Sequence, residues 1–256
     1  MIGTIIGDIA GSIYEFDNTA DYNFPFFAPD AEFTDDSICT LAVADAILNN
    51  KSYENAMHTL CRRYPNPMGA YGGSFYQWVM SDNPRPYNSF GNGAAMRVSP
   101  VAWLFDSETD VLAQAKASAE ITHSHPEGIK GAQAIAIAIF RMRKAAEKDS
   151  RIFTDVAGQF YGPDAFSRLP EPGYFDVTCQ GCVPLALKIA AEAESFEDAV
   201  RRAVVYGGDT DTVGAIVGSL AEARFGIPPE MQAKALQYLP DDLLAIVSQF
   251  QSGVNK

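Results

Sequence analysis

Cysteine is scarce in this chain, with four residues in 256. So few cysteines cannot supply the disulfide framework of a cysteine-rich secreted domain. Cys179 and Cys182 form a lone Cys-x-x-Cys pair, without the second pair or the histidines at suitable spacing that a structural zinc site needs. We therefore interpret them as small residues on either side of a turn at Gly181.

Basic residues are also few. Nineteen lysines and arginines stand against 32 acidic residues, which gives a formal net charge of −13. This negative charge argues against non-specific nucleic-acid binding and against docking on anionic membranes. It leaves room for a nucleotide ligand, because metal ions and helix N-termini can hold phosphates on an acidic protein.

Long hydrophobic runs are missing as well. No stretch is apolar over the length needed to span a bilayer. The N-terminal residues have no basic leader, and Asp8 interrupts their apolar run, which argues against a signal peptide. We therefore expect a cytoplasmic protein.

Alternating strand patterns are scarce, whereas helical spacing of apolar residues recurs along the whole chain. No change in composition marks a domain boundary. The sequence therefore predicts one all-α domain over residues 1–256, a single compact orthogonal helical bundle with its chemistry in a cleft at one end. Helices are expected at 52–64, 108–120, 128–147, 181–194, 196–205, 212–225 and 241–250, with less regular structure at 150–182.

Two short clusters of acids and hydroxyls stand out against this background. In Thr34-Asp35-Asp36-Ser37, Thr34 is a suitable N-cap for a helix with Asp35 and Asp36 in its first turn. The second cluster, Gly208-Asp209-Thr210-Asp211-Thr212, also precedes an apolar helix. Either cluster alone is compatible with ordinary capping. Two of them favour a shared dinuclear site for a hard divalent cation, because buried carboxylates need a compensating charge.

The N-terminal segment combines small and acidic residues at helical spacing. Gly3, Gly7 and Gly11 recur every four residues, which predicts close packing against another helix. Asp8 and Glu15 lie about two helical turns apart and would share one face of such a helix.

Two further polar segments are candidates for ligand contacts. Gly91-Asn92-Gly93 leads into a helix expected to begin near Ala94, with Arg97 in its first turn. Such a helix start suits a phosphate, although most Gly-rich turns are only turns, and the segment is not a P-loop. We interpret His123 and His125 as part of a polar pocket, since the carboxylates favour a hard ion over one that prefers imidazole. A histidine packed beside a helix cap is the alternative.

Taken in order, Gly7-Asp8 with Glu15, Thr34–Ser37, Gly91–Arg97, Thr122–His125 and Gly208–Thr212 resemble the ADP-ribosylglycohydrolase family. The combination is specific, although each segment alone is not. The resemblance implies an all-α fold that binds two Mg²⁺ or Mn²⁺ ions. It assigns the metals to Thr34, Asp35, Asp36, Asp209, Asp211 and Thr212. It assigns ADP-ribose contacts to Gly91, Asn92, Gly93, Ala94, Arg97 and His123.

The resemblance also implies the reaction, which is hydrolysis of the bond between C1″ of ADP-ribose and an acceptor. The acceptor would be a protein side chain such as arginine or serine, and ADP-ribose would be the product. A carboxylate near C1″ would act as a base and stabilise developing positive charge. The candidates are Asp36, Glu15 and Asp35, of which the first two are favoured.

Two other functions stay open at this point. The first is a hydrolase that acts on a free small ADP-ribosyl conjugate. The second is a non-catalytic ADP-ribose-binding protein. The two intact acidic clusters argue against the second, because buried acid pairs are costly to keep without a use.

Overall fold

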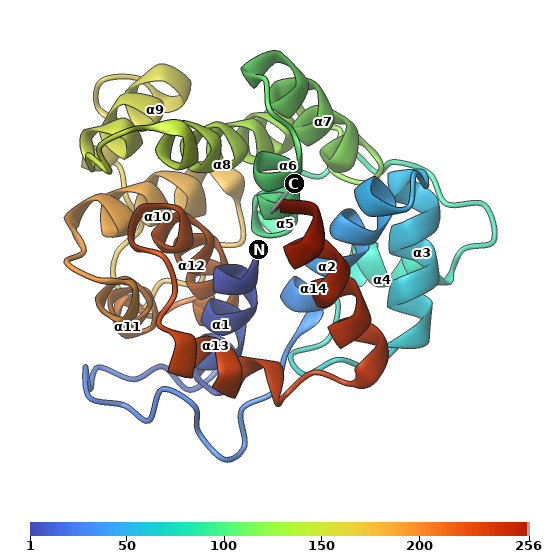
Figure 1. Ribbon diagram of the computed structural model, residues 1–256, viewed down its shortest axis with the longest axis horizontal. Helices are drawn as coiled ribbons and strands as arrows, with labels where there is room; N and C mark the ends of the chain where they lie inside the picture. The colour runs from blue at the N-terminus through green and yellow to red at the C-terminus, as the bar shows by residue number, and fades with distance from the viewer. Residues whose placement is uncertain (255–256) are drawn as a thin grey trace.

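The computed structural model describes residues 1–254 as α-helices joined by loops (Figure 1). No β-strand forms within these residues, and two isolated bridges, Thr34 to Met68 and Gly91 to Thr178, are the sheet-like pairings. The predicted all-α class is therefore confirmed. The elements are α1 (Ile2–Gly11), η1 (Ser12–Tyr14), α2 (Asp35–Leu48), α3 (Tyr53–Arg63), α4 (Gly73–Met80), α5 (Gly93–Met96), α6 (Ser99–Leu104), α7 (Glu108–Glu120), α8 (Pro126–Lys144), α9 (Arg151–Tyr161), η2 (Ala165–Ser167), α10 (Cys179–Glu192), α11 (Phe196–Tyr206), α12 (Thr210–Phe225), α13 (Pro229–Leu236) and α14 (Asp241–Val254).

Helices α1 and α12 pack almost backbone to backbone. Gly3 and Gly7 of α1 face Gly218 and Gly214 of α12, and a Cβ built on Gly214 would lie only 2.5 Å from the carbonyl oxygen of Gly7. The glycine stripe therefore packs closely against another helix, as the sequence predicts. Because α12 begins at the second acidic cluster and α1 leads towards Glu15, this crossing positions the two segments relative to each other.

The long helix expected over 128–147 is α8, which is buried along most of its length. It contacts α5, α7, α9, α10 and α12, and it lies between α9 and α10 in Figure 1. The hydrophobic core extends from Met1 to Phe250. Among the residues described, no helix has both the length and the apolar character needed to cross a bilayer.

Two helices lie where the sequence analysis predicts none. Helix α9 falls inside the segment expected to be less regular, because Phe153, Val156 and Ala157 form one buried face. Helix α13 begins at Pro229, directly after Pro228, because proline is well tolerated at the first position of a helix.

Three predicted helix positions also need correction. Helix α10 begins at Cys179, so Gly181 lies in the first turn of a helix and the two cysteines do not flank a turn. Helix α1 ends at Gly11 and tightens into η1, so Glu15 follows the helix and does not share a face with Asp8. Helix α5 is a single turn, and Arg97 is the residue that follows it, not a member of its first turn.

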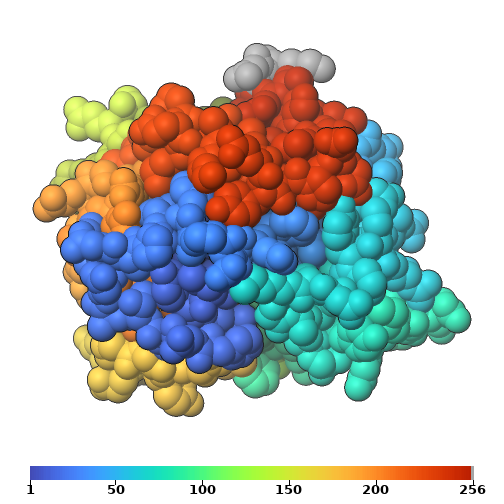
Figure 2. Space-filling view, turned by 90° about the horizontal axis from the view of Figure 1, so that it is seen from below, coloured from blue at the N-terminus to red at the C-terminus, as the bar shows by residue number. Residues whose placement is uncertain are grey.

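The chain between η1 and α2 forms a long surface loop. The Arg201 guanidinium of α11 donates to the carbonyl oxygens of Tyr22 at 3.0 Å and Phe24 at 2.8 Å. Figure 2 shows this blue N-terminal part of the chain between the red C-terminal helices and the cyan segment around α3 and α4.

Candidate active site

The two acidic clusters meet in a cavity of about 650 Å³. Its wall is built from the residues after η1, the first turns of α2 and α12, the loops at 69–73 and 87–92, and the loop before α10. Of the residues proposed from the sequence, those that line it are Glu15, Asp35, Asp36, Gly91, Asn92, Gly93, Arg97, His123, Asp209, Asp211 and Thr212.

Three proposed residues are not part of the wall. The pocket interpretation of His125 is wrong, because its Nδ1 accepts a hydrogen bond from the Glu127 amide at 3.1 Å and caps α8, which is the alternative of a histidine beside a helix cap. Thr34 and Ala94 are fully buried, each next in the chain to a residue that lines the cavity. Thr34 acts as the N-cap of α2, because its Oγ1 accepts a hydrogen bond from the Asp36 amide at 3.2 Å. That hydroxyl oxygen retains a second lone pair.

The first cluster is braced from α1. The buried carboxylate of Asp8 accepts hydrogen bonds from the amides of Thr34 at 3.0 Å and Ser37 at 3.1 Å, and from the Ser37 hydroxyl. The two amides are backbone donors that the start of α2 leaves without a partner inside the helix. Asp8 therefore fixes the helix start from which Asp35 and Asp36 reach the cavity.

The second cluster begins at a pair of glycines with left-handed backbone angles. Gly207 and Gly208 have φ of 80° and 81°, which turns the chain sharply from α11 into α12. Asp209 accepts a hydrogen bond from Nδ2 of Asn92 at 2.6 Å. Thr212 Oγ1 lies 3.3 Å from Oδ2 of Asp36 and donates to it, which joins the two clusters directly.

Glu15 completes the acidic group from a third direction. One oxygen each of Glu15, Asp209 and Asp211 lie within 4.8 Å of one another. Glu15 is partly exposed, whereas Asp209 and Asp211 are buried. Three carboxylates this close repel one another unless protons or a cation lie between them.

Burial and mutual repulsion dominate the electrostatics of the site. Burial, followed by the charges of Asp209 and Asp8, raises the pKa of Glu15 to about 7. Burial and neighbouring carboxylates also hold the pKa values of Asp35, Asp36 and Asp211 well above their usual range. Among the described residues that line the cavity, the only lysine or arginine is Arg97.

The donor set fits divalent cations. One oxygen of Asp36 and one of Asp211 are buried without a hydrogen-bond partner. Such orphaned carboxylate oxygens are rare in folded proteins and indicate a missing partner. Several carboxylates with a threonine hydroxyl are the hard oxygen ligands that Mg²⁺ and Mn²⁺ prefer.

His123 lines the opposite part of the cavity as a neutral donor. The Arg97 guanidinium donates to Ser118 O at 3.1 Å and to Thr122 Oγ1 at 2.7 Å. The Thr122 hydroxyl lies 2.7 Å from Nδ1 of His123, and its own proton is free to bond there. Nε2 of His123 then carries the ring proton, and burial keeps the pKa of this histidine well below its usual value. Arg97 therefore orients His123 through Thr122.

Sequence reasoning singled out Asp8 but not its bracing role, and it missed Asn18, whose side chain bonds the backbone of Gly208. Asp8 bonds the start of α2 only because α2 lies against α1 in the fold. Asn18 Oδ1 accepts a hydrogen bond from the amide of Gly208, which is far away in the sequence. No local pattern around Asn18 separates it from an ordinary polar loop residue.

The fold and the cavity thus define an all-α protein with an acidic site large enough for a nucleotide-sized ligand. The sequence matches the family described as ADP-ribosylglycohydrolase over residues 1–255, and the chain belongs to this family.

Several known proteins are similar to this chain. ADP-ribosylhydrolase ARH3 of Bos taurus is 23% identical to it, over 96% of this chain and 90% of the relative. ADP-ribosylarginine hydrolase Tri1 of Pseudomonas putida is 23% identical, over 91% of this chain and 72% of the relative. A solved structure described as an ADP-ribosylglycohydrolase-related protein complex shares the fold, with a TM-score of 0.76 and 22% identity over 99% of this chain and 95% of the other.

Family membership makes the chain an enzyme that hydrolyses ADP-ribose conjugates and releases ADP-ribose. The family is metal-dependent, and the acidic cluster is a site that could bind metal. The resemblance stated from the sequence is confirmed.

Proposed function

We propose that this enzyme cleaves the C1″ bond of ADP-ribosylated protein side chains, with two Mg²⁺ or Mn²⁺ ions bound between the acidic clusters. The observation that carries the proposal is the pair of buried, unpartnered carboxylate oxygens on Asp36 and Asp211. The proposed ligands are Thr34, Asp35, Asp36, Asp209, Asp211 and Thr212. When bound, the ions would supply Lewis-acid chemistry, which fixes ribose hydroxyls and makes a water more acidic.

Glu15 is the residue that we assign to accept a proton. It reaches the cavity wall while keeping some contact with solvent, so a proton that it accepts can pass on to water. Asp36 is fully buried and already accepts from Thr212, which favours a holding role for it. Asp35, on the same helix start, would stabilise positive charge at C1″.

The opposite wall would hold the ADP-ribose. Nε2 of His123 donates into the cavity beside Gly91 and Gly93, where a Cβ on either glycine would lie 3.4 or 3.0 Å from that nitrogen. The amides of Gly91 and Asn92 are already bonded to Ser89 Oγ and Val177 O. This leaves the amide of Gly93, which lines the cavity, as the donor that we assign to a phosphate, whereas the fully buried Ala94 lies behind it.

A panel of conjugates tests the proposal. Peptides that carry ADP-ribose on arginine or serine, and a free small ADP-ribosyl conjugate, are incubated with Mg²⁺, Mn²⁺ or EDTA, and released ADP-ribose is measured. We expect release from a peptide that EDTA abolishes, and a fall in kcat of about 100-fold in Glu15→Gln. The exposed Glu32→Gln is the matched control and should retain full activity.

Other results would support one of the alternative functions or contradict the metal site. Release from the free conjugate alone would identify a small-molecule hydrolase. Tight ADP-ribose binding by calorimetry without release from any conjugate would identify a binding protein. Full activity in EDTA would refute the metal site.

A further inference from the structure

Glu15 lies beside other carboxylates, which repel its negative charge. Its carboxylate shares a small volume with those of Asp209 and Asp211, and the helix that leads to it has already ended at Gly11. Like charges at such separations repel, and a loop residue is free to move away. The α1–α12 crossing and the packing of η1 on α12 bring this part of the chain near Asp209, and a direct contact is needed to fix the turn at Glu15 there.

The side chain of Asn18 makes that contact. Its Nδ2 donates to the carbonyl oxygens of Tyr14 at 2.6 Å and Glu15 at 3.3 Å, so it binds the turn that carries Glu15. The same amide group bonds both backbone groups of Gly208. Nδ2 donates to Gly208 O at 3.1 Å, and Oδ1 accepts from the Gly208 amide at 2.8 Å.

The glycine pair before Asp209, Gly207 and Gly208, lets the Asn18 side chain come close to the backbone. A Cβ at Gly207 would lie 2.9 Å from Oδ1 of Asn18, and a Cβ at Gly208 would collide with the carbonyl oxygen of Tyr174. Both glycines also need left-handed backbone angles. The backbone next to Asp209 is therefore open to Asn18 on one side and packed on the other.

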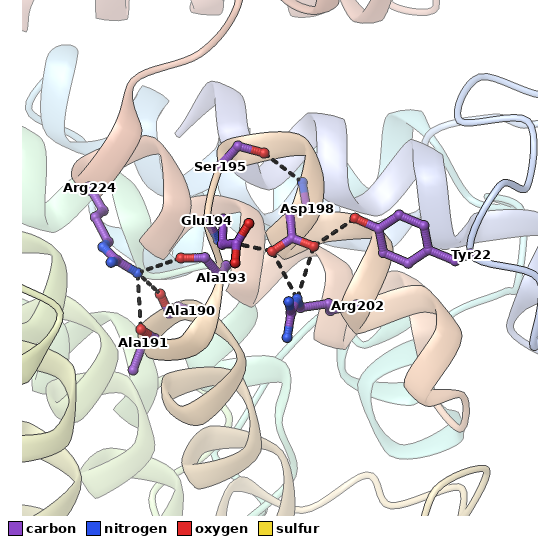
Figure 3. A network of polar contacts seen from close by, with 9 residues as sticks. All are labelled: Tyr22, Ala190, Ala191, Ala193, Glu194, Ser195, Asp198, Arg202 and Arg224. Carbon is purple, nitrogen blue, oxygen red and sulfur yellow. Dashed lines mark hydrogen bonds and ion pairs between the residues drawn. The ribbon is translucent and has the colours of Figure 1, made fainter.

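The other contacts of this loop do not reach the acids. Phe16 stacks on Phe175 with ring centroids 5.8 Å apart, but Phe16 is 76% exposed. The Tyr22 hydroxyl donates to Asp198 at 2.6 Å within the network that Figure 3 shows, in which Arg202 also donates to Asp198. This network anchors the loop to α11 beyond Asn18, and Tyr14 packs edge-on against Phe24 with ring centroids 5.1 Å apart. Asn18 supplies the hydrogen bonds that join the turn at Glu15 to Gly208.

We propose that Asn18 is a positioning residue, which holds Glu15 beside Asp209 by bonding both backbone groups of Gly208. This inference rests on the proposed function, because it matters for turnover only if Glu15 and Asp209 act together. Losing the Asn18 amide would release Glu15 from the site and loosen the backbone that presents Asp209.

A double-mutant cycle tests whether Asn18 acts through Glu15. The full chain is prepared as wild type, Asn18→Ala, Glu15→Gln and the double variant, with Tyr22→Phe as a control in the same loop. We expect Asn18→Ala to lower kcat about tenfold with little change in KM, and to weaken Mn²⁺ binding measured by calorimetry about tenfold. In the Glu15→Gln background with saturating Mn²⁺, Asn18→Ala should lower kcat clearly less than it does in wild type, and Tyr22→Phe should match wild type.

A metal-free measurement keeps the inference separate from the proposed function. Hydrogen exchange of the Gly208 amide, followed by NMR in EDTA, should be protected in wild type and faster in Asn18→Ala. If that variant fails to fold, Asn18→Asp replaces it in the kinetic and Mn²⁺ measurements, since it loses the donor to Tyr14 and Glu15 but keeps the acceptor for the Gly208 amide, which should stay protected. Equal losses of kcat in both backgrounds, or unchanged Gly208 exchange in a folded Asn18→Ala, would overturn the role of Asn18. Absence of Mn²⁺ binding by wild type would instead overturn the proposed function.

Discussion

Single carboxylates at the proposed metal site would reduce stability in exchange for cation binding. Asp211 is buried, and after burial the charges of Asp209, Asp36 and Glu15 hold its pKa well above the usual range. Without a cation, the folded protein must keep protons on these groups or tolerate their repulsion. Residues that serve function in this way commonly reduce the stability of the folded state.

Replacing Asp211 by asparagine should separate the two effects. In EDTA, Asp211→Asn should raise the free energy of unfolding by about 1 kcal/mol, because one repelling charge is removed. Saturating Mg²⁺ should stabilise wild type but not the variant, because a ligand has been lost. Urea unfolding with EDTA or Mg²⁺ measures both. Asp155→Asn makes the same change on the exposed face of α9 and should alter neither value by more than about 0.5 kcal/mol. A variant still stabilised by Mg²⁺ would contradict the assignment of Asp211.

Individual residues also show how far the site could be predicted. Thr34 and the acids after it were predictable, because an N-cap followed by acids and apolar spacing is a local pattern. The direction of Arg97 was not, because its guanidinium is held by Ser118 and Thr122, more than 20 residues along the chain. The contact of Asn18 with Gly208 spans a sequence separation of 190, and no local signal encodes it.

At the scale of helices, the crossing of α1 and α12 decides where the acids meet. The two helices approach so closely that the Cβ positions of Gly7 and Gly214 are filled by the partner backbone. The glycine spacing made a close crossing predictable, but it did not identify the partner helix. Helix α9 was predictable locally, because Phe153, Val156 and Ala157 have helical spacing and form one apolar face.

A methyl group at this crossing should be costly. Gly7→Ala gains up to about 1 kcal/mol of helix propensity. It must also displace the α12 backbone, which costs about 1 to 3 kcal/mol or more in a packed core. We expect a net loss of about 2 kcal/mol in thermal or urea unfolding. We also expect weaker Mn²⁺ binding, because the same crossing positions Asp209 and Asp211.

The matched control for that experiment lies in α9. Gly158 has no atom within 4 Å of a built Cβ. Gly158→Ala should therefore stabilise the protein by about 1 kcal/mol and leave Mn²⁺ binding unchanged. If Gly7→Ala and Gly158→Ala changed stability and Mn²⁺ binding to the same extent, the α1–α12 crossing would not constrain the site.

For the whole molecule, the net charge of −13 and the acidic cavity combine to make stability depend on pH and on cations. Burial raises the pKa of Asp8 to about 6, and burial with neighbouring carboxylates raises that of Glu15 to about 7. A carboxyl whose pKa is higher in the folded than in the unfolded state stabilises the fold at low pH. That contribution is lost as the pH rises through the folded-state pKa. His123, whose pKa is lowered, acts in the opposite direction.

The contribution of Glu15 can be isolated by comparing wild type with Glu15→Gln, because all other titrating groups are shared. Its unfolded pKa is near 4.5 and its folded pKa is about 7, so in EDTA wild type should lose stability relative to the variant between pH 5 and pH 8. The loss should amount to about 1 kcal/mol after allowance for the partial exposure of Glu15. Urea unfolding at four pH values measures it.

With Mg²⁺ at about 100 times its Kd, wild type should gain about 2.7 kcal/mol at pH 8 and less at pH 5, because protons compete with the cation for the same oxygens. A stability difference that stays constant with pH would show that Glu15 is not held among the other carboxylates in solution.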